Sequence, residues 1–322
     1  MAKILVTGAG GMLGQDLCPI LENEGHNVIR TDISDLDITN FDNVKSVLGL
    51  EKPDFVIHCA AYTNVDRAEE DYSTAHLVNV AGTENLARVC ANIGAVLVYI
   101  STDYVFDGWG TKPYKPDDKT SPVNKYGLSK RDGELAVRKY CEKFYICRTS
   151  WLYGIHGKNF VETMLMLAGV EPVSACESEP SRAKHNDTAV ATEAKEKGAQ
   201  QSLIAQAENA LAGVEPKLKV VDDQVGCPTW TVELSNAIVK IINEKPYGIY
   251  HTCGSGVVSW YGFAKKVFEL AGLKVNLKPC TTEEYPRPAK RPKYSVMDNE
   301  GICRDWQDAL AEYINLYHNC RI

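Results

Sequence analysis

A tyrosine and a lysine four residues apart are the pair in this sequence best suited to acid–base chemistry. Tyr126 and Lys130 lie in the segment Tyr-Gly-Leu-Ser-Lys, and on a helix two side chains at this spacing share one face. A phenol loses its proton at about pH 10, and a neighbouring ammonium favours the phenolate. Tyr126 could therefore protonate a carbonyl oxygen as a hydride reaches its carbon, or run the reverse. The same spacing also occurs by chance on exposed helix faces.

A run of polar residues supplies further groups for a carbonyl. Ser101, Thr102, Asp103 and Tyr104 come at the end of the predicted strand Val96–Ser101. In an open α/β sheet, ligands bind beyond the carboxyl ends of the strands. The Thr102 hydroxyl could thus hydrogen-bond the carbonyl that Tyr126 protonates. Capping of a helix or turn is the alternative role for these side chains.

A glycine-rich turn at the beginning of the chain predicts a dinucleotide site. Gly8, Gly11 and Gly14 have the spacing G-x-x-G-x-x-G, directly after the first apolar run, and Met12 and Leu13 begin the next helix. Glycines allow a tight turn and a close approach of the backbone to a pyrophosphate. Backbone N–H groups at the helix start, aided by the helix dipole, attract the negative charge. A plain strand–helix turn is the alternative.

An acidic residue after the second apolar run bears on the choice of cofactor. Asp32 follows the predicted strand Asn27–Thr31, where a carboxylate accepts from a ribose 2′-hydroxyl and repels a 2′-phosphate. This arrangement favours NADH over NADPH, although the adjacent Arg30 reduces that preference and leaves both cofactors open. We expect Asp37 and Ile38 to lie near the adenine.

These residues require a sheet to position them, and the apolar pattern predicts one. Continuous apolar runs that alternate with amphipathic segments are typical of parallel strands covered on both faces, which predicts an α/β, Rossmann-type doubly wound fold. The predicted strands are Lys3–Thr7, Asn27–Thr31, Phe55–Cys59, Val96–Ser101 and Phe144–Arg148, with helices at Thr74–Ala91 and Asn124–Tyr140.

The second half of the chain has a more mixed pattern and predicts a smaller C-terminal α/β substrate lobe. We therefore divide the chain into an NAD(P)-binding Rossmann domain at residues 1–150 and mainly a substrate-binding lobe at 151–322, some segments of which return to the Rossmann core. Its predicted elements are helices at Asn159–Ala168, Val232–Asn243, Trp260–Ala271 and Asp305–His318 and a strand at Leu218–Asp222.

An internal duplication marks an expected surface insertion at about 169–216. The sequence Ala168–Pro172 recurs as Ala212–Pro216, 44 residues further on. The segment between them is rich in Ala, Glu, Lys, Gln and Ser, and residues 173–211 contain no aromatic residue. Such a composition buries little apolar surface, which favours a solvated surface segment over the alternative, a partner-binding helix.

Bulk composition excludes several classes of function. The chain has 322 residues, of which 44% are hydrophobic and 24% charged, with a net charge of −7. It therefore lacks the basic footprint of a protein that binds nucleic acid or an anionic membrane, and no apolar run reaches the length of a membrane span. The eleven cysteines form no CxxC pair, which argues against a zinc or disulfide framework and predicts a cytoplasmic protein.

Several longer motifs are distributed along the chain. They are Ala-Ala-Tyr-Thr-Asn-Val-Asp-Arg-Ala-Glu from Ala60, Ser-Thr-Asp-Tyr-Val-Phe-Asp-Gly from Ser101, Arg-Thr-Ser-Trp-Leu-Tyr-Gly from Arg148, Val-Asp-Asp-Gln-Val-Gly-Cys-Pro-Thr from Val221, and Arg291-Pro292. Together they resemble the dTDP-4-dehydrorhamnose reductase family, within the extended short-chain dehydrogenase/reductase superfamily. The resemblance covers nearly the whole chain except the insertion.

This resemblance implies reduction of the 4-keto group of dTDP-4-dehydro-6-deoxy-L-mannose by NADH or NADPH, giving dTDP-L-rhamnose. It implies that Tyr126 is the proton donor, that Lys130 binds the nicotinamide ribose and lowers the pKa of the tyrosine, and that Thr102 holds the keto oxygen.

The resemblance also implies contacts with the two ligands. Asp103 and Trp151 would face the sugar and Arg291 would hold the diphosphate, although Trp151 could instead be core and Arg291 part of a solvated charge run. The cofactor would be lined by Ala60, Ala61, Tyr62 and Thr63.

Some members of this family use magnesium at a dimer contact formed by acidic side chains. Asp16 is the one positional candidate here, so the sequence supports no metal, and a homodimer stays open. Two other functions also stay open. One is a nucleotide-sugar epimerase or dehydratase that keeps its NAD. The other is a dinucleotide-binding regulatory subunit.

Overall fold

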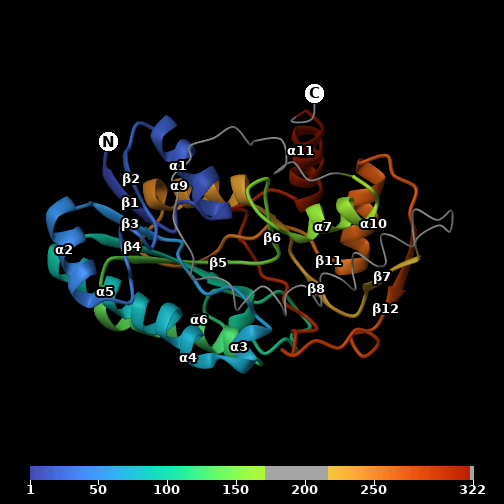
Figure 1. Ribbon diagram of the computed structural model, residues 1–322, viewed down its shortest axis with the longest axis horizontal. Coiled ribbons are helices and arrows are strands. Elements are labelled where there is room, and N and C mark those ends of the chain that lie inside the picture. Colours follow the sequence, from blue (N-terminus) through green and yellow to red (C-terminus); the bar gives the residue numbers. More distant parts are fainter. Residues whose placement is uncertain (171–216, 320–322) are drawn as a thin grey trace, which may run out of the picture.

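The computed structural model describes residues 1–170 and 217–319 (Figure 1). The predicted insertion lies almost entirely outside these described residues.

A six-stranded sheet forms the centre of the N-terminal part, and every adjacent pair in it is parallel. The predicted Rossmann-type fold is confirmed. Two strands have the predicted bounds, and three end within one residue of them. The strand order is β10 (Gly248–His251), β5 (Phe144–Thr149), β4 (Val96–Thr102), β3 (Phe55–His58), β1 (Lys3–Thr7) and β2 (Asn27–Thr31).

Helices cover both faces of this sheet (Figure 1). On one face, α1 (Met12–Asn23) and α9 (Thr231–Glu244) pack their leucines and isoleucines against β1, β3 and β4. On the other face lie α2 (Phe41–Glu51), α5 (Thr83–Ile93) and α6 (Lys125–Tyr140). Because α9 and β10 come from the second half of the chain, that half contributes to the Rossmann core.

The predicted helix Thr74–Ala91 is divided into three pieces. A short helix α4 (Tyr72–His76) continues into a π-helical turn, η1 (Leu77–Gly82), and then into α5. The π-helical turn contains Asn79, whose buried side chain accepts from the backbone N–H of Tyr62 at 2.8 Å and donates to its carbonyl at 3.0 Å. Single π-helical turns often occur at functional sites, and this one holds the segment that follows β3.

The C-terminal lobe packs three helices around an aromatic-rich core, and Figure 1 shows α7 and α10 at the opposite end of the molecule from α2. The helices are α7 (Phe160–Leu167), α10 (Trp260–Leu270) and α11 (Trp306–Asn319). Two-stranded sheets join β7 (Lys217–Val221) with β12 (Asn276–Cys280), β8 (Val225–Gly226) with β11 (Val258–Ser259), and β6 (Leu152–Tyr153) with β9 (Thr229–Trp230).

Two short helical segments follow β3 and β4, namely α3 (Arg67–Glu70) and the 3-10 turn η2 (Asp103–Val105). None of the helices in residues 1–170 and 217–319 combines the length and apolar character needed to cross a membrane.

Candidate active site

A cavity of about 890 Å³ lies where the strands β1, β3, β4 and β5 end, and it brings together most of the predicted site residues. We call it the main cavity. Its lining includes Gly8, Gly11, Met12, Leu13, Asp32, Ala60, Ala61, Thr63, Thr102, Asp103, Tyr126, Lys130 and Trp151.

The glycine turn forms one end of the main cavity. Gly8 has a φ of +65°, and a Cβ atom there would lie 2.8 Å from the backbone nitrogen of Ala60. Only glycine therefore allows β1 and the segment after β3 to approach this closely. The Asp32 carboxylate accepts from the backbone N–H of Gly10 at 3.0 Å, which holds the acidic group beside the turn. This cradle fits the pyrophosphate and adenosine ribose of a dinucleotide.

Three residues expected near the cofactor do not line the main cavity. Ile38 is buried in the core between the sheet and the helices α2 and α5, and a Cβ atom at Gly82 would contact it. The Asp37 carboxylate is used locally, because it accepts from the backbone and the hydroxyl of Thr39 at 2.9 and 2.7 Å. The backbone N–H of Tyr62 donates to the Asn79 side chain. Neither Tyr62 nor Asp37 belongs to the cavity wall.

The start of α6 places Tyr126 in the main cavity. Asn124 caps the helix by accepting from the backbone N–H of Gly127 at 2.7 Å. Gly127 packs directly on the carbonyl of Tyr104, leaving no space for a Cβ atom. The rings of Tyr126 and Tyr104 then meet edge to face with centroids 5.8 Å apart. This close packing brings the phenol of Tyr126 within hydrogen-bond reach of Thr102.

The pKa of Tyr126 is raised above its ordinary value. Loss of hydration is the main cause, the nearby Asp103 adds to it, and the hydrogen bond with Thr102 opposes it. Tyr126 therefore carries its proton at neutral pH, as a proton donor must. The lowering that the resemblance implied is the opposite of this direction.

The position of Lys130 explains why the pKa of Tyr126 is not lowered. It is buried on the same face of α6, and its Nζ lies 4.1 Å from the centroid of the Tyr99 ring. Burial lowers the pKa of Lys130 to about 7, opposed by the neighbouring Glu134 and Cys59. The ammonium thus interacts mainly with groups below the cavity floor, and it is not among the causes that shift the pKa of Tyr126.

Thr102 and Asp103 follow β4 and form the floor beside Tyr126. The Thr102 hydroxyl donates to Asp103 Oδ1 at 3.0 Å and accepts from the backbone N–H of Tyr104 at 3.2 Å. Burial raises the pKa of Asp103 to about 7, and hydrogen bonds with Ser295 and Thr102 oppose that shift. A hydroxyl, a phenol and a carboxyl with a raised pKa therefore meet where a carbonyl could be held.

A buried ion pair below this floor was not predicted. Arg148 at the end of β5 binds both carboxylate oxygens of Glu134 on α6, at 2.9 and 2.8 Å, and Ser101 donates to the same carboxylate at 2.6 Å. Arg148 also donates to the carbonyl of Pro116 at 2.9 Å. Glu134 stands eight residues after Tyr126, so the helical period already placed it on the catalytic face.

Trp151 reaches the main cavity as part of an aromatic stack. Its ring lies parallel to that of Trp260, with centroids 3.6 Å apart and an interplanar angle of 7°. Both rings line the cavity, and Gly226 lies against the edge of Trp151. Trp260 was not predicted as a site residue. The stack fixes Trp151 and gives the cavity an apolar aromatic wall.

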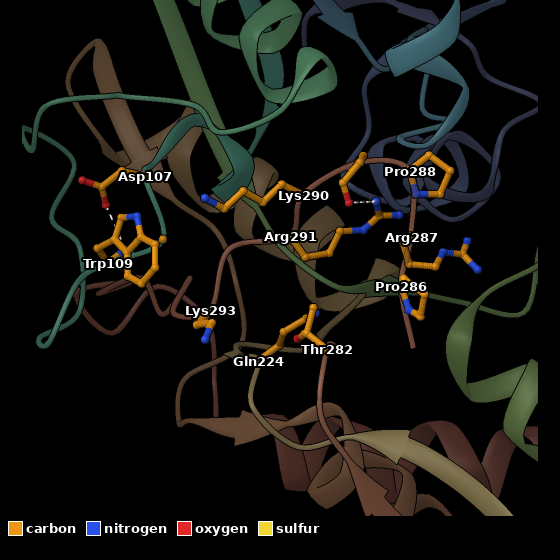
Figure 2. Close-up of a pocket in the computed structure, with 12 residues that line it drawn as sticks. Asp107, Trp109, Gln224, Thr282, Pro286, Arg287, Pro288, Lys290, Arg291 and Lys293 are labelled. Atoms are coloured by element: carbon orange, nitrogen blue, oxygen red, sulfur yellow. Dashed lines mark hydrogen bonds between the residues drawn. The ribbon is translucent and has the colours of Figure 1, made fainter. Parts of the chain in front are cut away.

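Arg291 lies in a second cavity of about 330 Å³, shown in Figure 2. Arg287 and Arg291 stand on one side of it and Trp109 on the other. Arg291 donates to Asp66 at 2.6 Å, and Arg287 donates to the same carboxylate at 2.7 Å. The remaining lining includes Lys290, Lys293, Gln224 and Thr282.

The two cavities are neighbours. Arg291 also hydrogen-bonds Tyr104, which lines the main cavity, and Asp66 follows Val65, another main-cavity residue. A ligand with a sugar at Tyr126 could therefore extend toward the basic second cavity.

Asp16, the expected candidate for a metal, is engaged within the chain. Its carboxylate accepts from the Thr231 hydroxyl and lies 3.4 Å from Nε2 of His156. Within the described residues, no three His, Cys, Asp or Glu side chains are grouped as metal ligands.

The parallel sheet, the glycine turn and the Tyr126–Lys130 helix define a dinucleotide-binding α/β protein of the short-chain dehydrogenase/reductase type. The model of the RmlD substrate binding domain family matches residues 2–178 and 198–319. The chain therefore belongs to this family, as the resemblance predicted. Residues 179–197, which the family model does not match, fall within the predicted insertion.

Three relatives illustrate this membership. The spore coat polysaccharide biosynthesis protein SpsK of Bacillus subtilis is 39% identical over 98% of this chain and 97% of its own. A crystal structure of a dTDP-4-dehydrorhamnose reductase from Clostridium acetobutylicum is 41% identical, with a TM-score of 0.82 over 98% of this chain and 99% of that one. The Bacillus anthracis enzyme of the same name, in complex with NADP, is 36% identical, with a TM-score of 0.81 and the same coverage.

Proposed function

We propose that this protein reduces the 4-keto group of dTDP-4-dehydro-6-deoxy-L-mannose with NADH or NADPH and releases dTDP-L-rhamnose. The observation that carries the proposal is the meeting of Tyr126 and Thr102 in one cavity with the glycine turn, in a member of a family whose solved relatives are named dTDP-4-dehydrorhamnose reductases.

The chemistry follows from the protonation states on the cavity floor. When bound, the reduced nicotinamide supplies a hydride for the carbonyl carbon. The Thr102 hydroxyl would turn its one hydrogen from Asp103 to the keto oxygen, and Tyr126, protonated at neutral pH, donates its proton to that oxygen. Lys130, with a pKa of about 7, lines the same cavity and is suited to hold the nicotinamide ribose.

The walls of the two cavities support recognition of a nucleotide-linked sugar. Trp151, fixed by Trp260, offers an apolar plane to the pyranose, and Asp103 offers a carboxyl to its hydroxyls. Arg287 and Arg291 can hold a diphosphate in the second cavity, where their guanidinium groups are already oriented by Asp66.

The cofactor preference stays between NADH and NADPH. Asp32 beside the turn favours NADH, whereas the Bacillus anthracis relative was solved with NADP. Arg30 is paired with Glu22 at 2.8 Å, so Glu22 competes with a 2′-phosphate for its guanidinium.

The test is an assay that couples dTDP-glucose to the dehydratase and epimerase reactions that generate the keto sugar, followed by the purified protein with NADH or NADPH. We expect cofactor oxidation that depends on the keto sugar, with dTDP-L-rhamnose as the product. Cofactor binding without oxidation in the presence of fresh keto sugar would contradict the proposal. Protein that purifies with tightly bound NAD would indicate an epimerase instead.

A cytoplasmic location and a homodimer complete the proposal. The nine cysteines of the described residues are free thiols, which supports a reducing compartment. Sedimentation of the purified protein measures the oligomeric state directly.

A further inference from the structure

A basic loop lies against the first turn of α1 and lines the main cavity. This loop, residues Ile155–Lys158, connects β6 to α7, and all four of its residues line the cavity. A Cβ atom at Gly157 would lie 3.8 Å from the Cβ of Met12, the first residue of α1. The loop therefore faces the helix terminus where the glycine turn presents its N–H groups.

The loop is held in place from both sides. Asn159 donates to the carbonyls of Gly154 and Gly157, at 2.7 and 3.0 Å, while its own side chain oxygen caps α7. On the α1 side, His156 lies 3.4 Å from Asp16. Asp16 is fixed in turn by the Thr231 hydroxyl at the start of α9. Two elements of the Rossmann core thus fix the position of a loop that belongs to the other lobe.

The charges of the cavity wall indicate which group this loop could bind. The cavity contains the acidic groups Asp32 and Asp103, and its buried cation, Lys130, interacts with Tyr99 below the floor. A dinucleotide pyrophosphate carries two negative charges, and the helix dipole offsets only part of them. Lys158 is an exposed lysine on the wall that faces the first turn of α1.

We propose that the loop Ile155–Lys158 is the second wall of the cofactor's pyrophosphate site, with Lys158 as its cation and His156 and Asp16 as positioning residues. This inference rests on the proposed function, because it takes the glycine turn to bind a dinucleotide. The substrate-side lobe then contributes directly to binding of the cofactor and closes the pyrophosphate between itself and α1.

Calorimetric titration of the full chain with NADH, NADPH and ADP-ribose tests this assignment. ADP-ribose contains the pyrophosphate but lacks the nicotinamide. In Lys158→Met we expect the affinities for all three ligands to fall about ten-fold, a change typical of the loss of one charge-assisted contact. Lys158→Arg keeps the charge and should bind like the unmodified protein. Lys274→Met removes an exposed lysine in the loop between α10 and β12 and serves as the matched control.

The outcomes separate the two proposals. If the unmodified protein binds none of the three ligands, the proposed function itself fails. If it binds them and Lys158→Met binds equally well, only the role of Lys158 fails. A loss confined to NADPH would place Lys158 at the 2′-phosphate and overturn the pyrophosphate assignment. Equal losses in Lys158→Met and Lys274→Met would show a general charge effect and also overturn it.

Discussion

Tyr126 is partly buried against Tyr104 and lies near Asp103, and both surroundings keep its phenol protonated. The protein thus prepares the acid form, which a reduction consumes, instead of the phenolate that an oxidation needs. Asp103 is shifted in the same direction and shares its hydrogen bond with Thr102. At the scale of single residues, burial therefore raises the pKa of both Tyr126 and Asp103 on the floor of the main cavity and favours their protonated forms.

Tyr126→Phe removes the donated proton and keeps the ring. We expect turnover to fall by roughly two to four orders of magnitude while NADH affinity and thermal stability stay close to those of the unmodified protein. Steady-state kinetics and cofactor titration measure the two effects. Tyr140→Phe, at the end of the same helix, is the matched control and should keep full turnover. Near-normal turnover of Tyr126→Phe would mean that another group supplies the proton.

Asp103→Asn should change how stability depends on pH. Folding raises the pKa of Asp103 from 3.8 to about 7, so the folded state holds this proton more tightly than the unfolded state does. The unmodified protein should lose stability relative to Asp103→Asn as the pH rises from about 4 to about 7, with a constant difference above that. Urea unfolding across this range measures the effect, with Asp117→Asn as the exposed control. Parallel profiles for the unmodified protein and Asp103→Asn would contradict it.

Among the elements, α6 supplies Tyr126 and Lys130, and its position is fixed at two points. Its first turn packs on Tyr104 through Gly127, and its middle is joined to β4 and β5 by Glu134. These contacts set the distance between Tyr126 on the helix and Thr102 on the strand. The hydrophobic pattern predicted the helix, but the ion pair depends on β5 lying beside β4, which only the fold determines.

Glu134→Ala should destabilise the protein by about 3–5 kcal/mol, because it leaves the Arg148 guanidinium buried without its partner. Urea unfolding monitored by circular dichroism gives this free energy. The double variant Glu134→Leu with Arg148→Met removes both charges and should recover much of the loss. If the double variant is as unstable as Glu134→Ala, the unpaired charge is not the cause.

Over the whole molecule, the two halves of the chain are interleaved. The helix α9 covers the leucines of α1, and β10 extends the parallel sheet beside β5. The sequence predicts a division at residue 150, and α9 and β10, which come after it, pack in the Rossmann core as part of the sheet and its covering layer.

A fragment of residues 1–150 should therefore fail to fold cooperatively. Without α9 and β10, it exposes the apolar face of α1 and the edge of β5 to water. Circular dichroism and urea unfolding of the fragment, compared with the full chain, measure this. A single sharp unfolding transition of the fragment would contradict the expectation.

The sequence predicted five parallel strands because each is a continuous apolar run, and it predicted the catalytic pair from the helical period. It did not predict β10, because Gly-Ile-Tyr-His lacks the continuous apolar run that marks the equally short β3, Phe-Val-Ile-His. It also could not predict that Arg291 binds Asp66, since 225 residues separate them. The Trp151–Trp260 stack likewise joins segments that become neighbours only in the folded lobe.

That stack has an optical consequence. Trp151 and Trp260 are two of the five tryptophans of the chain, and both border the main cavity. Tryptophan emits light that reduced nicotinamide absorbs, so a reduced cofactor in this cavity should quench the emission of the nearby pair. Occupancy of the site can then be followed by fluorescence, without the sugar and without turnover. In Trp260→Leu the quenched fraction of the emission should shrink, because one of the two nearest emitters is gone.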